Sequence, residues 1–254
     1  MRLIVPVTLL LMSASAAADE DPGIPGFDRP GIGFGTDAVP RGALALEFGL
    51  PSYLREGERD GPRSTTWSSD VLLRTGLAPR WELQLASTPW QRQQQGAADQ
   101  PRRRLRGAGD STLALKWTGP DSSAGTTWAL LASAVVARGD AAFSDGRQYA
   151  LGASLEHEFS PRWSAALYAS HQRGDGQHSS NWSPSLALTV SERLGAYLEA
   201  GFSRSNDGPD QAIAGLGLTW LLRPNVQLDA SFDLGLDADS PDLQFGTGLA
   251  IYLD

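Results

Sequence analysis

The residues from 226 to 237 alternate between apolar and polar or small side chains without interruption. The apolar set is Val226, Leu228, Ala230, Phe232, Leu234 and Leu236. The intervening set is Gln227, Asp229, Ser231, Asp233, Gly235 and Asp237. Because successive side chains of an extended chain point to opposite sides, this pattern predicts a strand with one apolar and one polar face. Its length, about twice the usual 5–6 residues, suits a tilted crossing of a bilayer, which needs about 9–11 residues.

The pattern recurs from residue 42 onward. It predicts twelve strands, at about 42–50, 65–76, 80–90, 107–118, 126–138, 146–159, 162–173, 182–191, 193–204, 210–222, 224–237 and 242–253. Tight turns alternate with generally longer polar connections, such as 52–64, 91–106 and 174–181. Short periplasmic turns and longer external loops are typical of bacterial outer-membrane barrels. The prediction is therefore an all-β fold, an antiparallel up-and-down transmembrane β-barrel of about twelve strands.

Alternation alone does not show which face meets lipid, because a soluble β-sandwich or lipocalin-like barrel has the same period. The tryptophans favour a membrane: five stand beside the tight turns and three near the opposite ends of the predicted strands. Two aromatic rings are typical of the two interfaces of a membrane barrel, whereas large aromatics of a soluble barrel more often fill the core. The predicted membrane-interface residues are Trp67, Trp81, Trp90, Trp117, Trp128, Trp163, Trp182 and Trp220.

The polar face carries charges that a water-filled lumen would tolerate. The predicted pore-lining residues are Glu47, Asp70, Arg74, Glu82, Lys116, Glu156, Glu199, Asp229 and Asp233. With Asp110, Glu158 and Asp237 added, ten inward acids oppose two bases, and such a field favours cations or neutral solutes over anions. The alternative is that arginines entering from loops neutralise the acids and leave a plugged lumen, because unpaired inward charges are costly.

The first residues predict export. Arg2 precedes a short apolar stretch, residues 3–12, and Ala16-Ala17-Ala18 offers a cleavage site before Asp19. We therefore divide the chain into a signal peptide (1–18), a Gly/Pro-rich lead-in (19–41) and the barrel (42–254). A retained N-terminal anchor is the less favoured alternative, because the apolar stretch is too short to span a bilayer. The lead-in is either a plug inside the lumen or a periplasmic tail.

Composition excludes several classes of function. The formal net charge is -8, and an acidic exported chain is a poor candidate for binding nucleic acid. The absence of cysteine excludes a disulfide-stapled domain and Cys-based metal or redox sites. The three histidines, His157, His171 and His178, are scattered without neighbouring carboxylate ligands, so we expect no metal and no cofactor.

Several motifs resemble those of one family. They are the ending from Leu228 to Leu249, the segment from Arg29-Pro30-Gly31 through Val39-Pro40-Arg41-Gly42-Ala43-Leu44-Ala45-Leu46-Glu47, the segment 107–117, and the Pro-Arg-Trp turns at 79–81 and 161–163. In these segments the chain resembles the outer-membrane proteins grouped as "MetA-pathway of phenol degradation" transporters. The resemblance implies an outer-membrane β-barrel that moves small solutes, aromatic or hydrophobic ones among them.

Two further motifs raise other chemistries. Residues 101–106, Pro-Arg-Arg-Arg-Leu-Arg, lie on the longest predicted loop and suit the phosphates of lipopolysaccharide, although a solvated loop is the more ordinary reading. His178-Ser179-Ser180 has a His-x-Ser spacing used by some lipid hydrolases, but a loop position does not enforce the pairing. We therefore predict a non-enzymatic channel or facilitated transporter whose partners are outer-membrane lipids, lipopolysaccharide and a small solute. A lipid-modifying hydrolase and a closed structural barrel are the alternatives.

Overall fold

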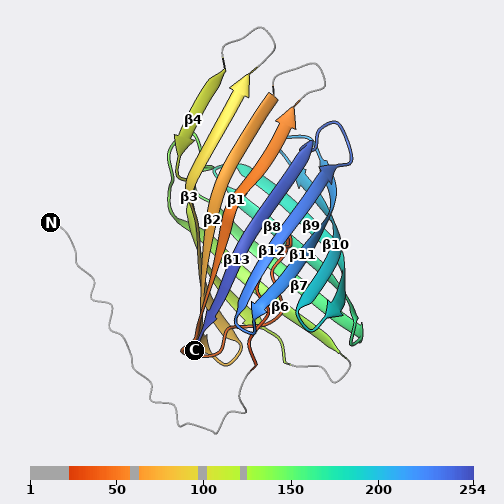
Figure 1. Ribbon diagram of the computed structural model, residues 1–254. Coiled ribbons are helices and arrows are strands. Elements are labelled where there is room, and N and C mark those ends of the chain that lie inside the picture. Colours follow the sequence, from red (N-terminus) through yellow and green to blue (C-terminus); the bar gives the residue numbers. More distant parts are fainter. Residues whose placement is uncertain (1–22, 58–62, 97–101, 121–124) are drawn as a thin grey trace, which may run out of the picture.

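The computed structural model describes residues 23–57, 63–96, 102–120 and 125–254. Within these ranges all regular structure is β-strand (Figure 1). The predicted signal peptide lies outside the described residues. The strands are β1 (Leu44–Gly57), β2 (Arg63–Ala78), β3 (Trp81–Gly96), β4 (Arg103–Gly107), β5 (Ser111–Thr118), β6 (Thr126–Ala137), β7 (Tyr149–Ser160), β8 (Trp163–Gly174), β9 (Gln177–Ser191), β10 (Leu194–Ser205), β11 (Gln211–Arg223), β12 (Val226–Gly235) and β13 (Leu243–Leu253).

The sheet closes on itself. Each strand pairs antiparallel with its neighbours, and β1 pairs with β13 from Leu44↔Leu253 to Arg55↔Leu243. Both β4 and β5 pair with β3, so together they form one interrupted strand of the wall. The barrel is therefore twelve-stranded, as the alternation predicts. Apart from β4, which pairs only with β3, closure leaves no unpaired strand edge in the described part of the wall, as a sheet in lipid requires.

The interruption between β4 and β5 has a local cause. The carboxylate of Asp140, from the connection between β6 and β7, accepts a hydrogen bond from the Ala108 amide at 2.7 Å. The Gly109 amide instead donates to the Thr88 carbonyl at 2.8 Å, and Asp140 N donates back to the Ala108 carbonyl. The connection between β6 and β7 thus takes over both backbone groups of Ala108, while the Gly109 amide stays bonded to β3, and the regular ladder stops there.

Several strands are longer than the sequence predicts. β1 continues to Gly57, and β2 already begins at Arg63. β3 and β4 occupy much of the predicted loop 91–106. The predicted loop 174–181 is wrong, because β8 and β9 are joined by only two residues, Asp175 and Gly176. Both have a positive φ, 45° and 89°, the conformation that an Asp-Gly hairpin turn supplies. The other end of the barrel carries two-residue turns such as that between Ser160 and Trp163.

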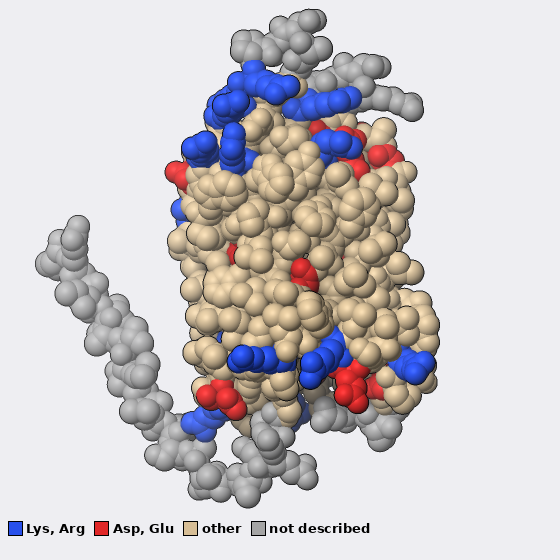
Figure 2. All heavy atoms as spheres, in the orientation of Figure 1, with Lys and Arg blue, Asp and Glu red and all other residues tan. Residues whose placement is uncertain are grey.

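The two faces follow the alternation. In β12, Asp229 and Asp233 are buried inside the barrel while Phe232 and Leu234 are exposed outside. Across the wall, leucines such as Leu151, Leu198 and Leu216 are exposed in the same way. Figure 2 shows the result on one side, a belt almost free of charge between two zones that carry Lys, Arg, Asp and Glu. No helix within the described ranges is long and apolar enough to cross a bilayer.

Candidate functional site

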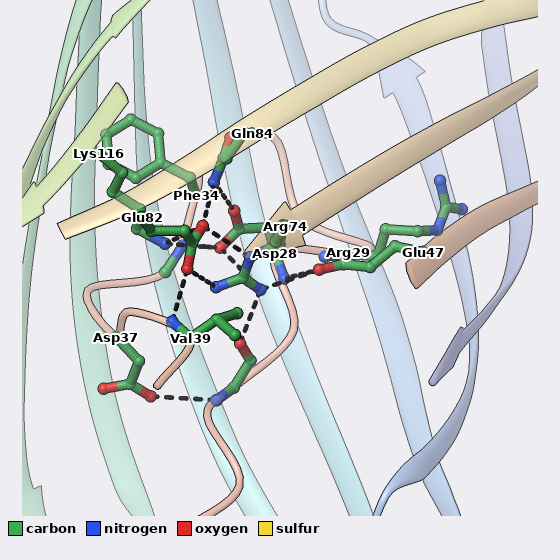
Figure 3. A network of polar contacts seen from close by, with 12 residues as sticks. Asp28, Arg29, Phe34, Asp37, Val39, Glu47, Arg74, Glu82, Gln84 and Lys116 are labelled. Carbon is green, nitrogen blue, oxygen red and sulfur yellow. Dashed lines mark hydrogen bonds and ion pairs between the residues drawn. The ribbon is translucent and has the colours of Figure 1, made fainter. Parts of the chain in front are cut away.

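The lead-in runs inside the barrel, where its residues from 26 onward contact inward-facing side chains (Figures 1 and 3). A small apolar cluster fixes its end: Val39, Ala43, Ala45 and Tyr252 are buried together, and Phe27 packs against them. Tyr252 and Ala45 are opposite each other in the β1–β13 pair, at the tight-turn end of the barrel. The lead-in therefore joins the wall where β1 begins.

Arg74 is the centre of the charged network in Figure 3 and is fully buried. Its Nε and Nη2 donate to the two oxygens of Glu82 at 2.9 and 3.1 Å, a bidentate pair. Its Nη1 donates to Glu47 at 2.9 Å and to the carbonyl oxygen of Gly26 at 3.0 Å. One guanidinium from β2 thus connects carboxylates on β1 and β3 with the lead-in.

The same carboxylates bind the lead-in backbone. Glu47 accepts hydrogen bonds from the amides of Asp28 and Arg29 at 3.1 and 2.8 Å. Glu82 accepts one from the amide of Val39 at 2.7 Å. Two buried acids therefore satisfy backbone donors of a segment that belongs to no sheet, which is the condition for irregular backbone inside a membrane barrel.

Asp28 carries the lead-in's own charge into this network. Its Oδ1 accepts a hydrogen bond from Lys116 Nζ at 3.1 Å and lies 3.5 Å from Arg74 Nη1, and its Oδ2 accepts from Gln84 at 2.9 Å. Burial alone would raise the pKa of Asp28, but Arg74 and Lys116 outweigh it and hold the pKa below 3.8. Lys116 also lies 5.5 Å above the ring of Phe34, within cation–π distance.

The Arg29 side chain makes a second set of contacts, on the neighbouring part of the wall formed by β2, β12 and β13. Its guanidinium donates to Asp70 at 2.7 Å, to Asp229 at 3.3 Å and to the Thr247 carbonyl at 3.1 Å. Its own carbonyl accepts a hydrogen bond from Gln227 at 3.3 Å. The residue thus spans β2, β12 and β13, and it brings a positive charge to two of the predicted pore-lining acids.

Residues 32–36 reach the far wall. The Ile32 amide donates to Glu199 at 3.0 Å, and Ser154 donates to the Phe34 carbonyl at 2.6 Å. The Phe34 ring meets the ring of Tyr168 edge-on, with centroids 5.6 Å apart. The hydroxyls of Thr36 and Thr127 are hydrogen-bonded at 2.7 Å. The lead-in is therefore held on several sides of the barrel.

Glycines in the wall make room for the lead-in. A Cβ added at Gly76 would overlap the carbonyl oxygens of Val39 and Pro40, and one at Gly248 would overlap the Arg29 side chain. Any larger side chain at these positions would displace the lead-in, so the absence of a side chain there has a packing cause.

Two cavities flank the lead-in. One of about 530 Å³ lies towards the tight turns and is lined by Glu156, Ser185, Thr219 and other residues of β7–β11. The other, of about 460 Å³, is lined by residues of β2, β3 and β5, including Asp70 and Thr88. Residues 28–31, 33 and 34 line both cavities. Empty space in the lumen is thus present next to both sides of the same short segment.

The structure gathers most of the predicted pore-lining residues around the lead-in. Glu47, Arg74, Glu82, Lys116, Asp70, Asp229 and Glu199 all contact it. Glu156 lines the first cavity, and Asp233 is buried with one carboxylate oxygen that has no hydrogen-bond partner within the described part of the chain.

Three additional acids of the predicted inward set lie away from the network. Glu158 and Asp237 are exposed, the latter in the connection after β12. Asp110 lines the second cavity but holds the connection before β7 by accepting from the amides of Gly139 at 2.7 Å and Asp145 at 3.2 Å.

The tryptophans all lie on the outer face, with six exposed by 38–52% and Trp117 and Trp128 half-buried. Three of them adjoin one another at the tight-turn end. The ring centroids of Trp81 and Trp117 are 6.1 Å apart, and those of Trp117 and Trp128 are 4.9 Å apart. Near the other end of the barrel, Trp67 lies several residues after the start of β2 and Trp90 several residues before the end of β3. The expectation that the tryptophans of this end stand near the strand ends is therefore wrong for Trp67 and Trp90, because the strands extend further than the apolar pattern.

The histidines pair differently from the sequence expectation. Ser180 lies on β9 rather than in a loop, and its hydroxyl is 2.9 Å from Nδ1 of His171, its direct neighbour on β8. His178 lies 6.1 Å from His171 between ring centroids. No group of three or more His, Asp or Glu residues that could hold a metal ion occurs within the described ranges.

Three comparisons place this geometry among known proteins. A search of curated proteins finds no match. The solved structures most similar in fold include an outer membrane channel from Pseudomonas putida F1, with a TM-score of 0.69 and 13% identity over 88% of this chain and 98% of that one. The KdgM porin in complex with disordered oligogalacturonate matches with a TM-score of 0.54 and 9% identity, over 82% and 98% of the two chains. The NanC porin matches with a TM-score of 0.53 and 6% identity, over 83% of this chain and 99% of that one.

These likenesses show the fold, that of barrels in the bacterial outer membrane. The family model described as "Putative MetA-pathway of phenol degradation" matches residues 27–253, which is most of the chain, and so includes part of the lead-in as well as the barrel. The protein is therefore an outer-membrane β-barrel that belongs to the family of the putative MetA pathway of phenol degradation.

Proposed function

We propose that the protein is a passive outer-membrane channel for small solutes and that its lead-in is a plug that closes the lumen. The observation that carries the proposal is that residues 28–31, 33 and 34 line both cavities. If this segment moved aside, the two spaces would join into one path. The neighbours of similar fold include channels and porins, which supports transport over a purely structural role.

The charge of the two cavities supports a preference for cations or neutral solutes. The first cavity is lined by Asp28, Glu156 and Glu199, and the second by Asp28, Asp70 and Asp110, while Arg29 is the base that lines each. A narrow path with an excess of acids attracts cations and repels anions. Reversal potentials in planar bilayers test this step, and a preference for anions would contradict it.

A third cavity supports aromatic or hydrophobic solutes as the class transported. It has a volume of about 290 Å³ and is lined by apolar and aromatic side chains together with amides. They include Ile32 of the lead-in, Tyr168 of β8 and Ile213 of β11. Apolar walls with a few polar groups are typical of sites for small organic ligands. Uptake of small aromatic compounds by cells with and without the protein tests the class.

A disulfide between lead-in and wall tests the plug itself. The chain has no cysteine, and the hydroxyls of Thr36 and Thr127 are in direct contact at 2.7 Å. The double variant Thr36→Cys/Thr127→Cys would therefore place its sulfurs where a bond of about 2.05 Å can form. In planar bilayers we expect low conductance when the variant is oxidised and higher conductance after reduction. Thr36→Cys alone is the control and should not respond to oxidant.

The other outcomes are also informative. Equal and high conductance in both redox states would mean that the lead-in does not block the lumen. Equal and negligible conductance, also after deletion of residues 23–41, would favour a closed structural barrel.

The paired His171 and Ser180 keep lipid hydrolysis as a second candidate. Their 2.9 Å contact on the outer face has the geometry of a base and a hydroxyl. A dyad of this kind also needs a group that orients the histidine and donors for the developing oxyanion. No carboxylate within the described residues is hydrogen-bonded to His171, so we favour the channel. Loss of phospholipid or lipid A hydrolysis in Ser180→Ala would support the hydrolase instead.

A further inference from the structure

The predicted arginine-rich loop is in fact part of the barrel wall. Arg103–Gly107 forms β4, which pairs with β3 from Gln91↔Gly107 to Gln95↔Arg103. In Figure 1, β1 to β4 rise beyond the remaining strands at the end opposite to the C-terminus. Pairing fixes the direction of each arginine in this region, which a loop would not do.

Five arginines of this extension share the outer face. Trp67 is opposite Arg92, and Arg92 is opposite Arg106, so all three side chains point to the same side. Trp67 is an outward residue, since it is exposed and its ring packs 4.9 Å from that of Tyr53. By the same alternation Arg104 and Arg63 also point outward, and the Arg102 side chain lies beside Gly96 on that face. We name these residues the arginine patch: Arg63, Arg92, Arg102, Arg104 and Arg106. Figure 2 shows a concentration of basic side chains over this end.

The patch begins at the level of the membrane surface. Trp90 is exposed on the outer face of β3, and Arg92 follows two residues later on the same face. Two residues of a strand span roughly 7 Å. Exposed tryptophans of membrane barrels lie at the lipid headgroups, so Arg92 and Arg106 lie at or just outside the headgroup layer. Because this end carries the long hairpins, it is the external one.

The arginines of the patch have no counter-charge in the described part of the chain. Arg92 and Arg106 are directly opposite each other, and like charges in that position destabilise a pair of strands. Among the described residues neither of the two forms an ion pair with Asp or Glu, whereas Arg55 on β1 pairs with Asp242 at 3.3 Å. The Nε of Arg92 is buried and has no hydrogen-bond partner among the described residues. An anion bound between the two side chains would remove both costs.

We propose that the arginine patch binds the phosphate groups of lipopolysaccharide in the outer leaflet. Guanidinium groups bind phosphate oxygens through paired hydrogen bonds, and the planar fork suits this contact better than an ammonium group does. Lipopolysaccharide presents several phosphates at one headgroup, which matches several arginines on one face. The strands β2–β4 continue outward beyond Arg92, so the patch extends alongside the sugar region as well as the headgroup.

Binding of purified lipid A to the refolded full-length protein in detergent micelles tests the proposal. The variant Arg92→Gln/Arg106→Gln should bind bisphosphorylated lipid A at least about tenfold more weakly, because each hydrogen bond to a charged group contributes roughly one factor of ten. Dephosphorylated lipid A should bind both proteins equally weakly. The matched control is Arg162→Gln/Arg193→Gln, which removes two exposed charges at the tight turns and should bind like the parent.

Three results would overturn the proposal. The first is unchanged binding of bisphosphorylated lipid A by Arg92→Gln/Arg106→Gln. The second is an equal loss in the control variant, which would indicate net charge alone. The third is equal affinity for phosphatidylglycerol with the same dependence on Arg92 and Arg106, which would indicate any anionic lipid. Migration of unheated protein on a gel reports folding, and Arg92→Lys/Arg106→Lys, with intermediate affinity expected, serves if the first variant does not fold.

Discussion

Replacing Arg74 by methionine should release the lead-in from the wall. The substitution keeps an unbranched side chain of similar length but removes the charge that lies between Glu47, Glu82 and Asp28. It also removes the hydrogen bond to the Gly26 carbonyl. The three acids would then face one another in a buried site with Lys116 as the nearest remaining base, 3.1 Å from Asp28 and 3.9 Å from Glu82.

The expected size of the effect follows from this geometry. Removing one partner of a buried ion pair costs about 3–5 kcal/mol, since the other partner is left without compensation. Every 1.4 kcal/mol is about a tenfold change in an equilibrium. If the protein relieves the cost by undocking the lead-in, the undocked fraction rises by roughly two to three and a half orders of magnitude. Arg74→Lys, which keeps the charge and loses the bidentate contact, should give an intermediate rise.

A single cysteine reports undocking. Thr36 is 7% exposed and contacts Thr127, so a thiol at this position is protected while the lead-in is docked. In the Thr36→Cys background, we expect a membrane-impermeant maleimide to label the Arg74→Met protein at least about a hundredfold faster than the parent, in proportion to the open fraction. The exposed-turn variant Arg162→Gln is the control and should label at the parent rate.

One result would refute the reasoning directly. If the Arg74→Met protein is folded, as judged by heat-modifiable migration, and still labels at the parent rate, then the Arg74 network does not hold the lead-in. The remaining contacts, through Arg29, Glu199 and Thr127, would then be sufficient by themselves.

Three further predictions address pH, packing and membrane position. The pKa of Asp28 is held below 3.8, so its contribution to docking is complete above that value and is lost as the pH falls through the lower, folded-state pKa. Conductance should therefore rise when the pH falls from 5 to below about 4. Gly76→Ala should accelerate labelling at Thr36→Cys because its Cβ would overlap the Pro40 carbonyl, whereas Gly246→Ala, which meets only the Ser231 and Ser52 hydroxyls, should not. Fluorescence of Trp90 and Trp220, each as the sole tryptophan, should be quenched more strongly by lipids brominated near the headgroup than near the bilayer centre, and the reverse order would contradict the interface assignment.

Much of the wall could be predicted from the sequence because its determinants are local. The alternation in β12 determines that Asp229 and Asp233 point inward and that Phe232 and Leu234 point outward. The tight turns and the number of strands follow from the same pattern. The Asp175-Gly176 turn also had a local signal, the Asp-Gly pair, but it was missed because the polar stretch around it lies beyond the apolar belt and resembles a loop.

The fourth strand shows where local pattern stops being sufficient. Residues 103–107 are mostly arginine and form a strand only because β3 supplies a paired edge. The hydrogen bonding of Ser180 also depends on strand pairing. Its partner is His171, opposite it in the β8–β9 pair, and not His178 two residues away in the chain. Sequence spacing cannot show cross-strand neighbours until the register is known.

The sequence by itself determined the period, the facing and the residues available to the lumen, because side-chain direction in a strand depends only on position along the chain. It also showed that inward acids outnumber inward bases and that arginines could neutralise some of them. Only the tertiary structure decided which arginine of the lead-in or loops neutralises inward acids. Arg29, from the lead-in rather than an external loop, meets Asp70 and Asp229 because closure of β1 on β13 brings β2 and β12 to the same side of the lumen. Contacts between residues 200 positions apart depend on that closure and not on any local pattern.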